Sequence, residues 1–378
     1  MDVVYSEAVN TLGKGLPCAI ATVIRTKGST PQKPGARLLV QANGLGAGTL
    51  GGGCVEAEVR LTAQNLLLKG GKALLEDFTL NDELAALDGL ECGGTMSFLI
   101  QPVADSQLSL DHIREVVAAH EGGQPVAFVS LISRPLGSDF SIGTHLFVRE
   151  NGESVGTLGH ARLDEFAVEK SRELMAHGKC ALLVSPEGAE IFVEAHTLPP
   201  TLVLCGGGHV AKAMAPLAKM LGFRLYVIDD RPEFVNPERF PEADKLVHAS
   251  YDEGLKQLHI SANTYILVAT RGHRLDDVAT EAAARSPATW VGLVGSKRKS
   301  ILVLEELFRK GVPEERIRQI RAPVGLDIGA RTPAEISVSI VAEMLMLRLG
   351  GAGRPLKMAD RLFLKAREKS EVQPAGKK

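Results

Sequence analysis

The sequence predicts a mixed α/β protein, in which a Rossmann-like, doubly wound parallel sheet follows an α+β region that contains an internal duplication. Three observations support this. Residues 17–75 recur at 125–183 with a constant offset of 108. From residue 201 onward, short β-branched runs alternate with helical ones, as in βαβ units. A run of three glycines, at residues 206–208, lies between a strand-like run and a helical one.

The duplication is clearest between residues 35 and 51. Nine positions there are identical in the second copy: Gly35, Leu38, Val40, Asn43, Gly44, Gly48, Thr49, Leu50 and Gly51 match Gly143, Leu146, Val148, Asn151, Gly152, Gly156, Thr157, Leu158 and Gly159. Each copy reads as a strand, a loop, a hairpin and a helix. We expect the first repeat at 1–104, a degenerate second repeat packed against it at 105–198, the Rossmann-like domain at 199–352, and a basic tail at 353–378 whose end is disordered.

The two copies differ at the residues of the first copy that are candidates for a chemical function. Gly52-Gly53-Cys54 becomes 160–162 (His-Ala-Arg), and the loop that holds Gly28 and Ser29 becomes 135–138 (Pro-Leu-Gly-Ser). A second glycine-flanked thiol, Cys92-Gly93, also has no counterpart. Since the strand pattern is kept without these residues, the fold does not require them. A thiol in the first turn of a helix is a candidate reactive or ligating sulfur; the alternative is that Cys54 only packs as a small apolar residue.

Composition excludes several classes of protein. The net charge is −2, with 43 basic and 45 acidic residues, and aromatic residues make up 4%. Neither a nucleic-acid partner nor a membrane surface is favoured by these values. The five cysteines are odd in number and lack a close C-x-x-C pair, so a disulfide framework or zinc knuckle is not expected. With no signal-like N-terminus and no run of about 20 apolar residues, we expect a soluble, cytoplasmic protein.

The glycine run of the third domain predicts a phosphate-binding turn. Gly206-Gly207-Gly208-His209 follows a strand and opens a helix, in a pattern that fits G-x-G-x-x-A, and Asp229 ends the next strand. Amides at the helix N-terminus receive the phosphate, and Asp229 could accept a hydrogen bond from a ribose hydroxyl. Arg231 could instead favour a phosphate, which leaves the cofactor type open. The alternative is a Rossmann-type domain that binds nothing.

Polar residues also follow two later strands of this domain. His273 follows the strand that ends near residue 269, and Gly295-Ser296 follows the strand that ends near residue 294. Ligands of open α/β sheets bind outside the carboxyl ends of strands, so these residues join the candidate site. The basic run at 297–299 reads more simply as a solvated helix face. Thr332-Pro333-Ala334-Glu335 predicts a capping box at the start of the last helix, which Gly350 ends.

Several motifs, taken together and in order, resemble the XdhC/CoxI family of xanthine dehydrogenase accessory proteins. They are the segments 28–31 (Gly-Ser-Thr-Pro), 50–56 (Leu-Gly-Gly-Gly-Cys-Val-Glu), 92–94 (Cys-Gly-Gly), 206–210 (Gly-Gly-Gly-His-Val), 229–234 (Asp-Asp-Arg-Pro-Glu-Phe), 292–296 (Gly-Leu-Val-Gly-Ser) and 325–333 (Gly-Leu-Asp-Ile-Gly-Ala-Arg-Thr-Pro). They cover most of the chain. One departure is 270–273 (Thr-Arg-Gly-His), where the resemblance leads us to expect a Thr-His-x-His turn.

The resemblance implies a chaperone for the molybdenum cofactor rather than an enzyme with its own turnover. Such a protein holds molybdopterin, or its cytosine dinucleotide form, while a cysteine desulfurase delivers sulfur, and it then inserts the cofactor into a molybdenum hydroxylase. Direct contact with molybdenum would come through Cys54 or Cys92, since soft thiolates suit this metal. A homodimer is plausible on the same resemblance. The alternatives are an NAD(P)-dependent oxidoreductase with His273 as proton donor, and a structural adaptor with a vestigial Rossmann domain.

Overall fold

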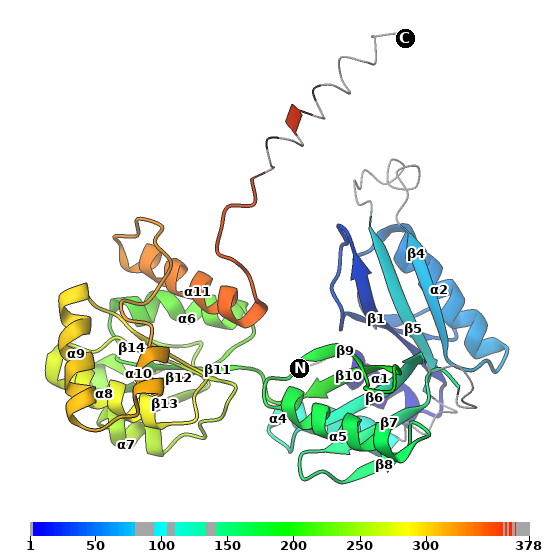
Figure 1. The fold of residues 1–378 in the computed structure, drawn as a ribbon, viewed down its shortest axis with the longest axis horizontal. Coiled ribbons are helices and arrows are strands. Elements are labelled where there is room, and N and C mark those ends of the chain that lie inside the picture. Colours follow the sequence, from blue (N-terminus) through cyan, green and yellow to red (C-terminus); the bar gives the residue numbers. More distant parts are fainter. Residues whose placement is uncertain are drawn as a thin grey trace. The chain divides into compact units, whose positions relative to one another are not determined.

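The structure is a computed structural model that describes residues 3–79, 94–103, 110–133, 141–357, 360, 363–364 and 367 (Figure 1). For 273 and 274 only the backbone is described. The chain divides into two compact units close to residue 201. The first unit holds the duplicated region and the second holds the three-glycine turn, so each is described by itself.

The first repeat forms an antiparallel sheet flanked by helices. Its elements are α1 (Val3–Gly13), β1 (Cys18–Lys27), β2 (Arg37–Gln41), β3 (Gly46–Gly48), α2 (Gly53–Leu68), β4 (Leu74–Thr79) and β5 (Thr95–Pro102). The described strands are ordered β3-β2-β1-β5-β4. Apolar side chains on one face of β1, β2 and β5, among them Ala19, Leu38 and Phe98, form a core under α2.

The second repeat has the same elements in the same order. They are α4 (Leu110–Glu121), β6 (Val126–Ser133), β7 (His145–Arg149), β8 (Ser154–Gly156), α5 (Ala161–Met175), β9 (Cys180–Val184) and β10 (Glu190–His196). The strand order, β8-β7-β6-β10-β9, is that of the first sheet. The predicted internal duplication is therefore confirmed at the level of topology.

A shared core joins the two repeats. Buried side chains from both sheets and from α1 and α4 form one cluster, which includes Ile20 and Leu39 from the first repeat and Phe128 and Phe147 from the second. A buried ion pair crosses this interface, with 2.6 Å between Arg37 Nε and Glu194 Oε1. The two side chains are only 10% and 5% exposed. The duplicated region thus folds as one unit with a charged pair inside its seam.

His196 predicts how this unit responds to pH. The imidazole is buried, its Nδ1 lies 3.2 Å from His120 Nε2, and its ring packs edge-on against Tyr5. Burial, with the nearby charges of Arg37 and His120, holds the pKa of His196 well below its usual value. The unfolded chain therefore binds a proton that the native protein does not, and stability should fall as pH drops below about 6.5.

Replacement of His196 by glutamine tests this expectation. Between pH 6.5 and 5.5, we expect the free energy of unfolding to fall more steeply in the parent protein than in His196→Gln. The difference between the two slopes should be up to about 1.4 kcal/mol per pH unit. Urea titrations at pH 7.5, 6.5 and 5.5 measure both slopes. Parallel slopes in the two proteins would show that His196 is not the group responsible.

The second unit is built on a five-stranded sheet of order β13-β12-β11-β14-β15. Its elements are β11 (Thr201–Cys205), α6 (His209–Met220), β12 (Arg224–Asp229), the 3₁₀ turn η1 (Pro232–Phe234), β13 (Lys245–His248), α7 (Tyr251–Lys256), β14 (Thr264–Val268), α8 (His273–Arg285), β15 (Trp290–Leu293), α9 (Lys297–Arg309), α10 (Glu314–Gln319) and α11 (Pro333–Leu349). This strand order is that of a Rossmann fold. The predicted C-terminal Rossmann-like domain is confirmed.

Helices cover both faces of this sheet. In Figure 1, α6 and α11 lie side by side on one face, and Ser337 Oγ of α11 donates to the carbonyl of Val210 in α6 at 3.1 Å. The predicted capping box is present at Thr332 and Glu335, and Gly350 ends α11 in the left-handed conformation. Among the helices of the described residues, none combines the length and the apolar character needed to cross a bilayer.

Candidate functional site

A turn of three glycines leads into α2 in the first repeat. Gly51, Gly52 and Gly53 have φ values of +105°, +74° and +68°. Residues with side chains rarely adopt this region, so glycine is the residue that such a turn requires. Cys54 follows in the first turn of α2 and is exposed. A Cβ on Gly52 would meet no atom within 4 Å, so the backbone here is open to a close approach.

A carboxylate holds this turn in place. Glu56 accepts hydrogen bonds from Thr49 Oγ1 at 2.8 Å, from the Leu50 amide at 2.8 Å and from the Gly52 amide at 3.2 Å. Burial raises the pKa of Glu56, but these hydrogen bonds, with that from Arg60, outweigh burial and hold it below its usual value. The carboxylate therefore stays ionised and the turn stays anchored at neutral pH.

The second repeat keeps this anchor and omits the thiol. Asp164, at the position that corresponds to Glu56, accepts from Thr157 Oγ1 and from the Leu158 amide, both at 2.7 Å. His160 takes the place of Gly52 with φ −150°, and its ring accepts a hydrogen bond from the Arg162 amide. A junction anchored by an acidic residue therefore forms in the second repeat with a different backbone conformation and without Gly52, Gly53 or Cys54, so the fold of a repeat does not depend on these three residues.

The other predicted residues of the first repeat lie in adjoining loops. A Cβ on Gly94 would collide with the carbonyl oxygen of Ser29, and a Cβ on Gly51 would lie 2.6 Å from Pro31 Cβ. The loop that contains Gly28 and Ser29 therefore packs against both glycine segments. Cys92 and Gly93 lie outside the described residues, directly before Gly94. The structure thus places the loop of Gly28 and Ser29 against Gly94 and, through Pro31, against Gly51, the residue that precedes Gly52.

The Rossmann turn combines two closed glycines with one open glycine. A Cβ on Gly206 would collide with the carbonyl of Ala269, and one on Gly207 would collide with the carbonyl of Phe234. Gly208, by contrast, would meet nothing within 4 Å. Gly208 is the N-cap of α6, whose end has no side-chain cap among the described residues. The first amides of α6 have no acceptor within their own helix, as at any helix N-terminus, and the space beside Gly208 is open.

Gly208→Val is expected to separate binding from folding. Gly208 has φ −68° and ψ −167°, a conformation that valine adopts, so the melting temperature should change little. The branched side chain would occupy the space where a phosphate approaches the turn, and phosphate-bearing ligands should bind at least tenfold more weakly. Gly207→Ala is the contrast, because its Cβ has no room and stability itself should fall. Equal ligand affinity in Gly208→Val and the parent protein would place the ligand elsewhere.

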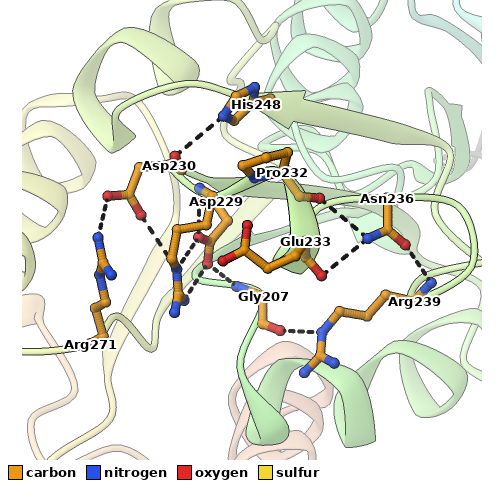
Figure 2. Close-up of polar contacts among 10 residues, drawn as sticks. Gly207, Asp229, Asp230, Pro232, Glu233, Asn236, Arg239, His248 and Arg271 are labelled. Carbon is orange, nitrogen blue, oxygen red and sulfur yellow. Dashed lines mark hydrogen bonds and ion pairs between the residues drawn. The ribbon is translucent and has the colours of Figure 1, made fainter.

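Asp229 lies beneath this turn with every acceptor position in use. It is fully buried at the end of β12. Figure 2 shows its carboxylate hydrogen-bonded to Gly207. Oδ2 accepts from the Gly207 amide at 2.7 Å and from Arg231 Nη2 at 3.1 Å, and Oδ1 accepts from Arg231 Nε at 2.9 Å and from the Arg231 amide at 3.1 Å. Burial raises the pKa of Asp229, but the Arg231 and Gly207 hydrogen bonds outweigh it and hold the pKa below its usual value.

Two further arginines complete this edge of the sheet. The Arg231 guanidinium lies 3.6 Å from the centre of the Phe234 ring, and Arg239, which donates to the Gly207 carbonyl at 2.7 Å, lies 4.9 Å from the same ring. Arg271 pairs with Asp230 at 2.9 Å. In Figure 2, Arg239 contacts the carbonyl of Gly207 and Arg271 contacts Asp230. Such stacking and pairing hold the guanidinium groups in fixed positions.

The remaining predicted residues lie at the ends of the neighbouring strands. His273 begins α8, but its side chain is outside the described part of the chain. Ser296 is the N-cap of α9 and accepts from the Lys299 amide at 3.3 Å. Gly295 packs against Lys299, since a Cβ there would lie 2.8 Å from Lys299 Cδ.

One interpretation of the basic run is wrong for Lys299. Instead of facing solvent, its Nζ lies 2.5 Å from Oδ2 of Asp276, a fully buried carboxylate that also accepts from Thr270 Oγ1 at 2.8 Å. This pair joins the segments that follow β14 and β15. Sequence reasoning missed Asp276, although an acidic residue in the first turn of α8, near a strand end, was the available signal.

Comparison with known families matches both units of the chain. Residues 12–78 and 119–185 each match the XdhC and CoxI family, one match for each repeat, and residues 202–344 match the XdhC Rossmann domain. The chain belongs to the XdhC/CoxI family. The first two matched segments fall within the two repeats of the first unit, and the third contains most of the parallel sheet of the second.

Three curated relatives are similar to this chain. An uncharacterized protein, YqeB of Escherichia coli, is 34% identical over 63% of this chain, a match that spans 46% of that relative's length. A protein of Bacillus subtilis, named as a probable subunit of xanthine dehydrogenase, is 28% identical over 87% of this chain and 92% of its own. The molybdenum cofactor insertion chaperone PaoD of Escherichia coli is 22% identical over 90% and 87%, respectively.

A solved structure shares the fold of this XdhC/CoxI protein. The crystal structure of a xanthine dehydrogenase from Bacillus halodurans aligns with a TM-score of 0.68 and 24% sequence identity. The alignment covers 94% of this chain and 98% of the other. The likeness extends over the duplicated region as well as the Rossmann domain.

Proposed function

We propose that this protein is a chaperone that holds the molybdenum cofactor for sulfuration and inserts it into a xanthine dehydrogenase-type molybdenum hydroxylase. Membership in the XdhC/CoxI family supports this, as do two of its relatives, one named as a probable xanthine dehydrogenase component and the other as a molybdenum cofactor insertion chaperone. The observation that carries the proposal is the contrast between the repeats. The glycine turn and thiol at Gly52-Gly53-Cys54 are absent from a second copy that keeps the same fold.

The first-repeat turn has the properties that such a cofactor requires. Its backbone is open at Gly52, and the exposed thiol of Cys54 lies in the first turn of α2. When bound, the cofactor supplies a molybdenum centre with sulfur ligands, for which a soft thiolate is a suitable partner. Cys54 would hold or position that centre, with the Gly28–Ser29 loop beside it. Cys92 and Gly93, which adjoin Gly94, are the further candidates.

The Rossmann unit, taken by itself, offers a second candidate site, suited to a phosphate group. Gly208 and the first amides of α6 form its open side, and helix N-termini favour anions. A cysteine desulfurase and a molybdenum hydroxylase are the partners that this function requires, and a homodimer is compatible with it. The protein would act in the cytoplasm. The alternative function is that of an NAD(P)-dependent oxidoreductase.

Ligand-dependent melting distinguishes these two functions. A ligand that binds only the native state raises stability by about 2.7 kcal/mol at a hundredfold excess over Kd. We expect molybdopterin, or its cytosine dinucleotide, to raise the melting temperature by several degrees, and NAD(P)H to raise it less. No hydride transfer should follow when alcohols or hydroxy acids are added. Strong stabilisation by NAD(P)H, with substrate-dependent loss of nicotinamide absorbance, would support the oxidoreductase instead.

A further inference from the structure

The carboxylate of Asp229 has no capacity left for a ligand. A carboxylate offers about four acceptor positions, and four hydrogen bonds from the protein fill them here. Two of these bonds form a fork with the Arg231 guanidinium, a geometry that is among the stronger polar contacts in proteins. In a Rossmann domain that binds a dinucleotide, an acid at this position accepts the hydroxyls of the ribose. In this chain, Arg231 occupies the acceptor positions of that acid which a ribose would otherwise use.

The neighbouring charges compensate one another in the same way. Arg231 pairs with Asp229 and lies 3.8 Å from Asp230, which in turn pairs with Arg271 at 2.9 Å. Two acids and two arginines therefore leave no net charge at the end of β12. An adenosine ribose that carries a 2′-phosphate needs an uncompensated cation at this edge. The end of β12 thus offers no acceptor for a ribose diol, and the remaining cation of this edge, Arg239, donates to the Gly207 carbonyl.

The pair also fixes the shape of the phosphate-binding turn. Asp229 Oδ2 holds the Gly207 amide, and Arg239 holds the Gly207 carbonyl from the other side. Phe234 packs beneath both arginines, and its carbonyl fills the space that a side chain at position 207 would need. The turn is therefore closed at Gly207 and open only at Gly208.

We propose that the Asp229–Arg231 pair is a specificity device that closes the ribose subsite of the Rossmann unit, so that this unit selects phosphate-bearing ligands without a ribose diol at the end of β12 and discriminates against NAD. This rests on the proposed function only in taking the glycine turn as the ligand site. It adds the chemical class of the ligand and assigns Asp229 to the protein rather than to the cofactor.

Paired ribose and dideoxyribose nucleotides test the proposal. We expect the parent protein to bind ADP and 2′,3′-dideoxy-ADP with equal affinity, or neither detectably, because no acceptor is available for the hydroxyls. Arg231→Lys keeps the positive charge but replaces the two-bond fork with a single ammonium contact. It should release an acceptor of Asp229 and produce a preference for ADP of about tenfold, the value of one hydrogen bond to a charged group. NAD affinity should rise by a similar factor.

Two controls make the result specific. Arg239→Lys alters the same turn and the same stacking on Phe234 without touching Asp229, so it should create no ribose preference. In the double variant Arg231→Lys with Asp229→Asn, the preference gained should disappear. Isothermal titration measures the affinities, and melting curves establish that each variant is folded.

Two outcomes would overturn the proposal. One is a parent protein that prefers ADP over its dideoxy analogue by threefold or more; the other is a folded Arg231→Lys that shows no preference. If Arg231→Lys does not fold, the parent comparison alone decides. Because the readout is nucleotide affinity, its failure is distinct from failure of the chaperone function, which is read from cofactor content.

Discussion

Replacing Arg37 with methionine should lower the free energy of unfolding of the duplicated unit by about 3–5 kcal/mol. The reason is that Glu194 would keep its carboxylate in the seam between the repeats, 5% exposed, after losing the guanidinium 2.6 Å away. Breaking a buried pair by removing one partner costs far more than the pair contributes. Denaturant titration followed by circular dichroism measures the change.

Arg25→Met is the matched control for this prediction. Arg25 also pairs with a glutamate of the other repeat, Glu190, and the distance is again 2.6 Å. These side chains are 49% and 26% exposed, so the loss should be about 0–1 kcal/mol. The double variant Arg37→Met with Glu194→Met should regain much of the stability that Arg37→Met loses. If Arg37→Met and Arg25→Met lower the free energy of unfolding by the same amount, burial of the Arg37–Glu194 pair does not determine the stability of the interface between the repeats.

Cys54→Ser should reduce activation of the molybdenum hydroxylase client by tenfold or more without lowering the melting temperature. Serine keeps the size of the side chain and removes the soft sulfur that suits molybdenum. Cys54 is exposed, so the substitution does not alter the buried core. Client activity after coexpression, normalised to client protein, is the measurement.

The second repeat supplies the control for Cys54. Arg162 occupies the corresponding position in α5, after a junction held by Asp164 as Glu56 holds the first. Arg162→Ser should leave client activation unchanged. Two results would indicate that Cys54 has only a packing role. One is a lowered melting temperature of Cys54→Ser, and the other is client activation by Cys54→Ser equal to that by Arg162→Ser.

Local patterns were sufficient to predict much of this fold. The offset between the repeats fixed their common topology because each strand and turn is specified by residues close in sequence, such as Gly44 and Gly152 in the hairpins, which both have positive φ. The capping box at Thr332 is local in the same sense. The Rossmann sheet followed from the alternation of strand-like and helical runs.

Contacts between distant residues could not be predicted in this way. Arg37 and Glu194 are 157 residues apart, and neither stands out in its own strand. Lys299 read as one member of a basic run because its partner, Asp276, belongs to another helix. The spacing to Asp229 predicted an acid at the correct strand end. It could not predict that Arg231 would hydrogen-bond to this carboxylate, since that contact depends on the turn at η1.

The cofactor content of the purified protein tests the central proposal most directly. Parent protein, Cys54→Ser and Arg162→Ser would be purified from molybdate-supplied cells, and molybdenum and pterin would be quantified per chain by mass spectrometry and by fluorescence of the oxidised pterin. We predict that the parent and Arg162→Ser retain equal amounts of both, and that Cys54→Ser retains at least tenfold less. Equal retention in all three proteins, or no molybdenum and pterin in the parent, would contradict a cofactor site at the glycine turn before α2.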